Sequence, residues 1–204
     1  MEKEREKLLE SLKEQGLSAE ILQAFATVKR EDFIPEAFSA YAYDDIALPL
    51  EDGTTLSQPS TIAFMLNLVE IKENMKILEI GSGSGYVLAL IKELTRSGEI
   101  YGLEINSSMA IKSTKILESN KNIKIINRSG IHGMPDKAPF DRILISASCP
   151  DRRIPYNLIE QLSQEGILIS AVKQSIIRIK KHDNKIDEEE FPGFAFVPFV
   201  VEEK

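Results

Sequence analysis

The sequence contains very few of the side chains on which most catalytic sites depend. Among its 204 residues are one Cys, two His and no Trp. One cysteine cannot form an internal disulfide, and so few Cys and His residues are a poor source of zinc ligands. A cysteine-rich secreted domain and a metal hydrolase are therefore unfavourable interpretations, and we expect no metal site.

Long apolar runs and an excess of positive charge are also missing. The longest apolar stretches fall well short of the roughly 20 residues that span a bilayer, and the charged residues 1–7 lack the apolar core of a signal peptide. Lys and Arg number 25 against 32 Asp and Glu, a formal net charge of −7, which argues against a general binder of phosphate backbones. We expect a cytoplasmic protein that binds neither membranes nor nucleic acids.

The amino-terminal part of the sequence predicts helices and one irregular segment. Apolar residues recur at helical spacing over residues 3–29, and a break before Ser18 divides them into two helices, the second capped by Ser18. Residues 33–50 lack clear periodicity, and such a long loop inside a compact domain is typically functional. Another helix is expected to follow, with Ser57 or Ser60 as its N-cap.

From residue 75 onward, short β-rich runs alternate with helical ones. Continuous Ile, Leu and Val runs separated by helices are typical of a parallel sheet that is buried on both faces. Segments 174–181 and 193–200 flank a charged stretch at 181–190 and predict an antiparallel hairpin with a long polar loop. The expected strands are 75–80, 99–104, 122–127, 142–147 and 167–172, and the expected helices are 86–95, 107–119 and 155–162.

A glycine-rich turn directly follows the first of these strands. The sequence Gly81-Ser-Gly83-Ser-Gly85 joins the strand to a helix. Glycines at such a turn let a ligand approach the backbone closely, and the helix N-terminus offers free N–H groups. The next strand ends in Glu104, 19 residues after Gly85, the usual position for an acid that binds ribose hydroxyls. These features predict a nucleotide-like ligand at the carboxyl end of the first strand.

Two classes of cofactor compete for this turn. A dinucleotide site has the spacing G-x-G-x-x-G, whereas this chain has G-x-G-x-G, with Glu79 two residues before the first glycine. A carboxylate there would repel a pyrophosphate, but it suits a ligand that carries a sulfonium and an amino group. The pattern favours S-adenosylmethionine over a dinucleotide, and a purely structural role for Glu79 in capping loop amides stays open.

Several segments resemble the protein-L-isoaspartate O-methyltransferase family. The turn and its strand are similar to the first motif of class I methyltransferases, in the form that this family favours. Because class I methyltransferases in general share only that motif, the segment Ser57-Gln-Pro59 decides the assignment. The resemblance covers about residues 20–200, almost the whole chain. The similar segments are 30–35, 40–45, 48–49, 53–59, 78–86, 138–141, 158–162 and 196–198.

The resemblance implies a Rossmann-like class I methyltransferase fold of the α/β class. Its sheet is expected to be mostly parallel, with the antiparallel C-terminal hairpin and an N-terminal helical extension. We find no repeat and no linker, so we expect a single domain over residues 1–204. Residues 1–72 would supply the N-terminal helices and a substrate-side loop, and residues 73–204 the cofactor-binding α/β core.

The resemblance also implies an activity and its residues. The family methylates the α-carboxyl of L-isoaspartyl residues in damaged proteins and peptides, converting S-adenosylmethionine to S-adenosylhomocysteine. Ser57 matches its active-site serine, in a loop that lies across the cofactor and helps to form the peptide site. The positions that match the cofactor site are Glu79, Gly81, Ser82, Gly83, Ser84, Gly85, Glu104, Ser129 and Gly130, and those on the substrate side are Thr55, Leu56, Gln58 and Pro59. We expect the chain to act as a monomer.

This reaction fits the sparse inventory of catalytic side chains. A carboxylate is ionised at neutral pH and is itself the nucleophile, so no general base is required. The cofactor carries the activated methyl group, and the protein has to align oxygen, methyl carbon and sulfur. Ser57 is therefore expected to orient the carboxylate by a hydrogen bond, since no His is placed to activate the serine as a nucleophile.

The segment after the third expected strand departs from the family's pattern. The family usually has Gly-Asp-Gly after its third strand, where the Asp contacts the adenine, and this chain has Arg128-Ser129-Gly130. Ser129 can exchange a hydrogen bond but has no carboxylate. Two alternatives stay open: a class I methyltransferase with another acceptor, such as a small carboxylic acid or RNA, and a cofactor-binding member that has lost catalysis.

Overall fold

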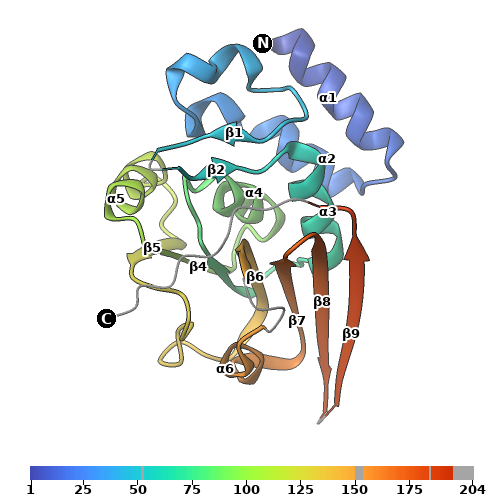
Figure 1. The fold of residues 1–204 in the computed structure, drawn as a ribbon, viewed down its shortest axis with the longest axis vertical. Helices are drawn as coiled ribbons and strands as arrows, with labels where there is room; N and C mark the ends of the chain where they lie inside the picture. Colours follow the sequence, from blue (N-terminus) through green and yellow to red (C-terminus); the bar gives the residue numbers. More distant parts are fainter. Residues whose placement is uncertain (52, 150–153, 184, 195–204) are drawn as a thin grey trace.

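Helices from the amino-terminal part of the chain lie above one end of a large twisted sheet in the computed structural model (Figure 1). The structure describes residues 1–51, 53–149, 154–183 and 185–194. Within those ranges, no helix is long and apolar enough to cross a bilayer.

The predicted N-terminal helix pair is confirmed. Helix α1 spans Glu2–Glu14 and helix α2 spans Ala19–Thr27. Ser18 is the N-cap of α2, and its hydroxyl accepts a hydrogen bond from the Ile21 amide at 3.4 Å. One apolar face of this pair is buried, because Leu12 and Phe25 are almost fully covered and belong to the main hydrophobic core.

The segment 33–50, which lacks periodicity in the sequence, forms short ordered elements instead of one long loop. Two 3-10 helices, η1 (Arg30–Phe33) and η2 (Glu36–Tyr41), precede the small antiparallel pair of β1 (Leu48–Pro49) and β2 (Thr55–Leu56). Elements of two to six residues have no room to show a hydrophobic period, which is why the sequence pattern missed them.

Helix α3 spans Pro59–Val69 and begins differently from the prediction. Its N-cap is Gln58, whose side chain makes no capping hydrogen bond, so the expected caps Ser57 and Ser60 were both wrong. Instead, the Asp45 carboxylate accepts a hydrogen bond from the Ser60 amide at 2.8 Å. A carboxylate 15 residues away in sequence therefore satisfies a free N–H group at this helix start.

Seven strands form one sheet in the order β5-β4-β3-β6-β7-β8-β9. Strands β3 to β7 pair in parallel and β8 and β9 pair antiparallel, as the sequence predicted. The strands are β3 Lys76–Ile80, β4 Glu99–Glu104, β5 Ile123–Asn127, β6 Phe140–Cys149, β7 Leu162–Val172, β8 Ser175–His182 and β9 Lys185–Pro192; the helices are α4 Tyr86–Leu94, α5 Ser107–Ile116 and α6 Tyr156–Glu160.

Both faces of the central strands are covered. Ile77 belongs to a core cluster with residues of α2, α3 and α4, whereas the next residue, Leu78, belongs to a second cluster with Leu158 and Ile159 of α6. Successive strand residues point to opposite faces, so burial of both neighbours places apolar packing on each side. This is why the central strands are continuous apolar runs.

The C-terminal hairpin is correct in kind but wrong in position. Strand β9 lies at Lys185–Pro192, so most of the charged stretch predicted as a loop is strand, and the strand predicted at 193–200 begins after β9 has ended. The side chains of this edge strand are mostly exposed, and charged residues are common on exposed edges. Residues 195–200, including the family-like segment 196–198, lie outside the described residues.

Candidate functional site

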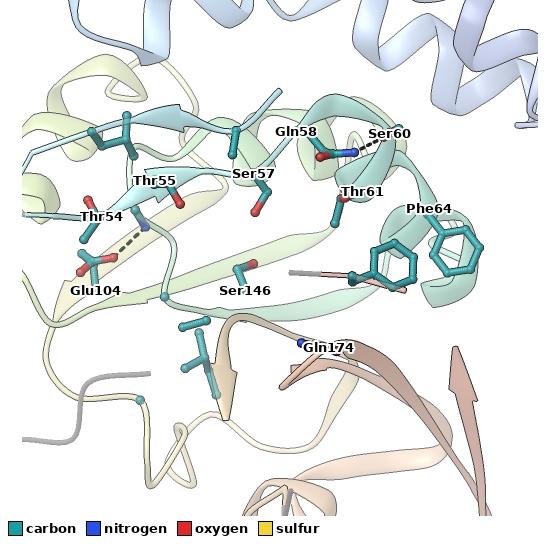
Figure 2. Close-up of a pocket in the computed structure, with 18 of the residues that line it drawn as sticks. Thr54, Thr55, Ser57, Gln58, Ser60, Thr61, Phe64, Glu104, Ser146 and Gln174 are labelled. Atoms are coloured by element: carbon teal, nitrogen blue, oxygen red, sulfur yellow. Dashed lines mark hydrogen bonds between the residues drawn. The ribbon is translucent and has the colours of Figure 1, made fainter. Parts of the chain in front are cut away.

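The order in which the chain adds strands to the sheet reverses beside β3, and the main cavity opens at that point. The chain continues from β3 to β4 and β5 on one side and returns to β6 on the other, which is the point where open α/β sheets bind ligands. A cavity of about 960 Å³ lies at the carboxyl ends of β3, β4 and β6, where Gly81, Glu104 and Ser146 line it. Its opposite wall comes from residues between β1 and α3 (Figure 2).

The glycine loop adopts backbone conformations that suit glycine. Gly81, Gly83 and Gly85 have φ of 77°, 52° and 85°, the left-handed region that other L-residues rarely adopt. At Gly85 there is also no room, because an added Cβ would lie 2.8 Å from Leu117 Cδ1 and 3.2 Å from Ser113 Cβ. The loop therefore brings the N-terminus of α4 close to the last turn of α5.

Glu104 holds the glycine loop as well as lining the cavity. One of its carboxylate oxygens accepts a hydrogen bond from the Gly83 amide at 2.7 Å, drawn in Figure 2, and the other accepts from the Asn106 amide at 2.8 Å. Each carboxylate oxygen can accept more than one hydrogen bond. Glu104 therefore keeps the capacity to bind hydroxyl groups of a ligand while it fixes the loop.

Glu79 is a buried carboxylate with one unpartnered oxygen. Ser146 donates a hydrogen bond from its hydroxyl to one oxygen at 2.6 Å, and the other oxygen, Oε2, has no partner. Burial raises the pKa of Glu79 to about 8, the Ser146 hydrogen bond opposes that shift, and the charge of Glu104 adds to it. Glu79 therefore keeps its proton at pH values where an exposed glutamate is already ionised.

A small inner cavity of about 50 Å³ adjoins the main one and collects unpartnered polar groups. Glu79, Ser82 and Ser84 all line it, and the hydroxyl oxygens of both serines are buried without a hydrogen-bond partner. Buried polar groups normally have partners because leaving them bare costs free energy. Three such groups around one space can exchange hydrogen bonds with a polar part of a ligand.

Ser57 lies where the two cavities meet. It follows β2 and precedes α3, and it lines both the main and the inner cavity. Its hydroxyl points into the main cavity on the side of Ser146 (Figure 2). The remaining wall is polar near Ser57 and aromatic farther out; it includes Gln58, Ser60, Thr61, Phe64, Gln174 and Phe194.

Most of the predicted site residues come together around the two cavities, although they are far apart in the sequence. The main cavity contains Thr55, Ser57, Gln58, Gly81, Gly83, Glu104 and Gly130, and the inner cavity adds Leu56, Glu79, Ser82 and Ser84. Three predicted residues line neither cavity: Pro59 begins α3, Gly85 caps α4, and Ser129 lies half-buried in the turn after β5. In the described part of the chain, no group of three His, Cys, Asp or Glu side chains is arranged to hold a metal ion.

Sequence reasoning missed two residues that organise the site. Ser146 forms the hydrogen bond to Glu79 from a strand 67 residues away, and nothing local marks it. Arg30 is fully buried and donates a hydrogen bond to the Ser57 carbonyl at 3.1 Å. The only indication in the sequence that Arg30 has a role at the site is that it lies in segment 30–35, which resembles the family.

Similar proteins share one described activity. Residues 3–204 match the family profile described as protein-L-isoaspartate(D-aspartate) O-methyltransferase. The protein-L-isoaspartate O-methyltransferase of Brucella anthropi is 38% identical over 208 residues, and that of Parvibaculum lavamentivorans is 35% identical over 209 residues. Each match covers 98% of this chain, and 94% and 92% of the respective relatives.

Solved structures confirm the predicted Rossmann-like methyltransferase fold. One protein-L-isoaspartate O-methyltransferase superposes with a TM-score of 0.87 and 27% identity over 95% of this chain, which spans 65% of that longer one. A putative protein-L-isoaspartate O-methyltransferase from Plasmodium falciparum, solved with S-adenosyl-L-homocysteine, has a TM-score of 0.81 and 24% identity, covering 95% of this chain and 97% of that one.

Proposed function

The chain belongs to the protein-L-isoaspartate(D-aspartate) O-methyltransferase family, and we propose that its two adjoining cavities divide that family's reaction into a cofactor site and a peptide site. The enzyme uses S-adenosylmethionine to methylate the α-carboxyl of L-isoaspartyl residues, a protein-repair reaction. The observation that carries the assignment of residues is the position of Ser57, which lines both cavities.

We assign the cofactor to the glycine loop and its two carboxylates. The unpartnered oxygen of Glu79 is available to accept from the amino group of the ligand, and Glu104 to accept from its ribose hydroxyls. Bound S-adenosylmethionine supplies a methyl group that its sulfonium already activates. Ser82 and Ser84 offer hydroxyls in the inner cavity, while Gly85, Ser129 and Gly130 shape the surrounding turns.

We assign the peptide to the wall between β2 and α3. The Ser57 hydroxyl would donate a hydrogen bond to one oxygen of the substrate carboxylate and leave the other oxygen free to attack. Holding reactants in line contributes several kcal/mol by proximity alone. Thr55 and Gln58 line the same wall, Leu56 lines the inner cavity, and Pro59 begins α3. No proton has to be removed from the nucleophile, so the lack of a nearby His does not oppose the reaction.

We further propose how the chain is organised and where it acts. Residues 1–204 would work as one domain, in which residues 1–72 contribute the N-terminal helices and the substrate-side loop, and residues 73–204 the cofactor-binding core. The net charge of −7 supports protein and peptide substrates over nucleic acids. We infer a monomer that acts in the cytoplasm on isoaspartyl-containing proteins.

Transfer of labelled methyl from S-adenosylmethionine tests the substrate. We expect labelling of an isoaspartyl peptide and essentially none of its sequence-matched aspartyl twin. In the isoaspartyl residue the peptide bond runs through the β-carboxyl and leaves the α-carboxylate free, whereas in the aspartyl residue the α-carboxyl forms the peptide bond. Isothermal titration with S-adenosylhomocysteine on the same preparation reports cofactor binding separately. Equal labelling of both peptides contradicts the assigned substrate. If S-adenosylhomocysteine binds but neither peptide is labelled, the result supports the alternative that this chain binds the cofactor and has lost catalysis.

Ser57→Ala should slow methyl transfer to the isoaspartyl peptide by about tenfold or more, since one hydrogen bond that orients the carboxylate is lost. The Kd for S-adenosylhomocysteine should stay within about threefold of the original, because the carboxylates and the glycine loop are unchanged. Ser163→Ala, which removes a hydroxyl bound to Asp141 away from both cavities, is the matched control. A large loss of cofactor affinity in Ser57→Ala contradicts its role on the peptide side.

A further inference from the structure

Arg30 is a buried cation whose hydrogen bonds all go to backbone carbonyls. The residue has 0% exposed surface. Its guanidinium donates to the carbonyls of Ala42, Asp44, Ile46 and Ser57, at 2.9, 3.3, 3.0 and 3.1 Å. Burying a guanidinium costs free energy unless its N–H groups are well satisfied. An apolar side chain in this place would leave the four carbonyls without these donors, so the arginine sets the positions of the backbone groups that it binds.

The four carbonyls belong to two segments, of which one, at Ser57, is part of the substrate wall and the other, residues 42–46, lies outside both cavities. Three come from residues 42–46 and the fourth is that of Ser57 itself, 27 residues from Arg30 in the sequence. Arg30 therefore joins one loop to the backbone of the residue assigned to the substrate carboxylate. Fixing the Ser57 carbonyl restricts the rotation of the backbone that carries its hydroxyl.

Two neighbouring contacts hold the same loop from other directions. The Tyr43 hydroxyl donates a hydrogen bond to the Glu31 carboxylate, next to Arg30 on η1. The Asp45 carboxylate accepts from the Ser60 amide at the start of α3. Residues 42–46 are thus tied to η1 on one side and to α3 on the other, with Ser57 at the junction.

The 3-10 helix that carries Arg30 also touches the cofactor side. Phe33, at the end of η1, packs against Tyr86, and their ring centroids lie 5.5 Å apart. Tyr86 is the first residue of α4 and directly follows Gly85 of the glycine loop. Helix η1 is therefore anchored to the element that begins at the cofactor loop, and through Arg30 it reaches the serine.

We propose that Arg30 is a positioning residue for methyl transfer, which holds Ser57 in register with the glycine loop and acts on the substrate carboxylate only through Ser57. The inference rests on the proposed function. Only an arginine can perform it, because a guanidinium has five donors in a planar fork, whereas a lysine ammonium has three donors around a point charge. The lysine variant keeps the positive charge and loses the span across both segments.

Arg30→Lys, compared with Arg142→Lys, tests the proposal. Arg142 is a similarly buried arginine near the start of β6, outside both cavities. It donates hydrogen bonds to the carbonyls of Asp141, its neighbour in β6, and of Glu70 at the end of α3. Each variant is scored for melting temperature, for Kd of S-adenosylhomocysteine, and for kcat and KM with an isoaspartyl peptide. The number of cofactor sites found by titration sets the concentration of folded enzyme.

We expect both variants to melt at lower temperature, since each loses carbonyl contacts of a buried guanidinium. Only Arg30→Lys should lower kcat per folded molecule, by about tenfold or more, with the Kd for S-adenosylhomocysteine within about threefold of the original. If Arg30→Lys keeps its kcat, or if both variants lose kcat equally, Arg30 is a structural residue and the proposal is overturned.

A second variant covers the case in which Arg30→Lys does not fold. Asp45 is exposed, and Asp45→Ala removes the contact to the Ser60 amide together with a carboxylate charge that favours the Arg30 guanidinium. We expect a smaller fall in kcat, about threefold, with cofactor affinity unchanged; an unchanged kcat overturns the idea that this loop positions Ser57. If the original enzyme itself labels no isoaspartyl peptide, the proposed function fails instead, which is a separate result from either variant.

Discussion

Glu79→Gln should stabilise the cofactor-free protein at alkaline pH and weaken its affinity for S-adenosylhomocysteine by roughly 10- to 100-fold. The glutamine keeps the size of the side chain and its hydrogen bond with Ser146, but it cannot become an anion. A neutral amide suits the buried inner cavity of the empty protein, whereas the ammonium group of the ligand requires a carboxylate. The same charge therefore opposes folding and favours binding.

The direction of the pH effect follows from the raised pKa of Glu79. Burial moves that pKa from 4.5 to about 8 in the folded protein, so the folded state holds the proton more tightly than the unfolded state does. Its stabilising contribution is full below pH 4.5 and is lost as the pH rises through 8. Above pH 8 the ionised side chain costs the fold roughly 5 kcal/mol relative to its protonated form.

Denaturant unfolding at pH 5 and pH 8.5 measures this contribution. The free energies of unfolding of the original protein and of Glu79→Gln should be similar at pH 5, and the variant should be clearly more stable at pH 8.5. Glu118→Gln changes an exposed glutamate and should show no such difference. Equal stability of the original protein and Glu79→Gln at both pH values contradicts a raised pKa at Glu79.

Cofactor affinity should follow the same ionisation. Ligand binding to the carboxylate releases a proton below pH 8, so the Kd for S-adenosylhomocysteine in the original protein should decrease by up to tenfold per pH unit between pH 6 and 8. In Glu79→Gln this slope should disappear. If the Kd of Glu79→Gln still changes with pH in this way, the proton released on binding comes from another group.

The parts of the site that could be predicted from sequence are those fixed by one strand and the turn after it. Parallel strands end at the same edge of a sheet, so Glu79, Gly81 and Glu104 had to meet once β3 and β4 were recognised. The apolar strand before each of these residues, and the glycines after β3, are visible in the sequence and predict where the residues lie. The same reasoning found the strands of the parallel sheet, because their apolar runs follow from burial on both faces.

Contacts between distant segments could not be predicted in this way. The hydrogen bond from Ser146 to Glu79 depends on the pairing of β6 with β3, and the four carbonyls on Arg30 depend on how an aperiodic segment folds. Strand β9 was missed for a different reason: its exposed edge carries charges that are typical of loops. The errors therefore lie where side chains are placed by tertiary structure instead of by local pattern.

Gly130→Ala should disrupt the main cavity, because Gly130 packs closely against the end of β3. An added Cβ would lie 2.2 Å from Ile80 Cγ2 and 3.3 Å from Ile80 Cβ. Ile80 is buried and β-branched, so its side chain has little freedom to move aside. Either the end of β3 or the turn around Gly130 must shift, and both line the main cavity.

We therefore expect Gly130→Ala to lower the free energy of unfolding by roughly 3 kcal/mol and to weaken S-adenosylhomocysteine binding by about tenfold or more, since Ile80 directly precedes the glycine loop. Denaturant unfolding and calorimetric titration measure the two effects. Ser163→Ala, outside both cavities, should leave the ligand affinity unchanged and lower the stability far less. If Gly130→Ala binds the ligand as tightly as the original protein, the turn after β5 yields easily, and the close approach of Gly130 to Ile80 does not set the shape of the cofactor site.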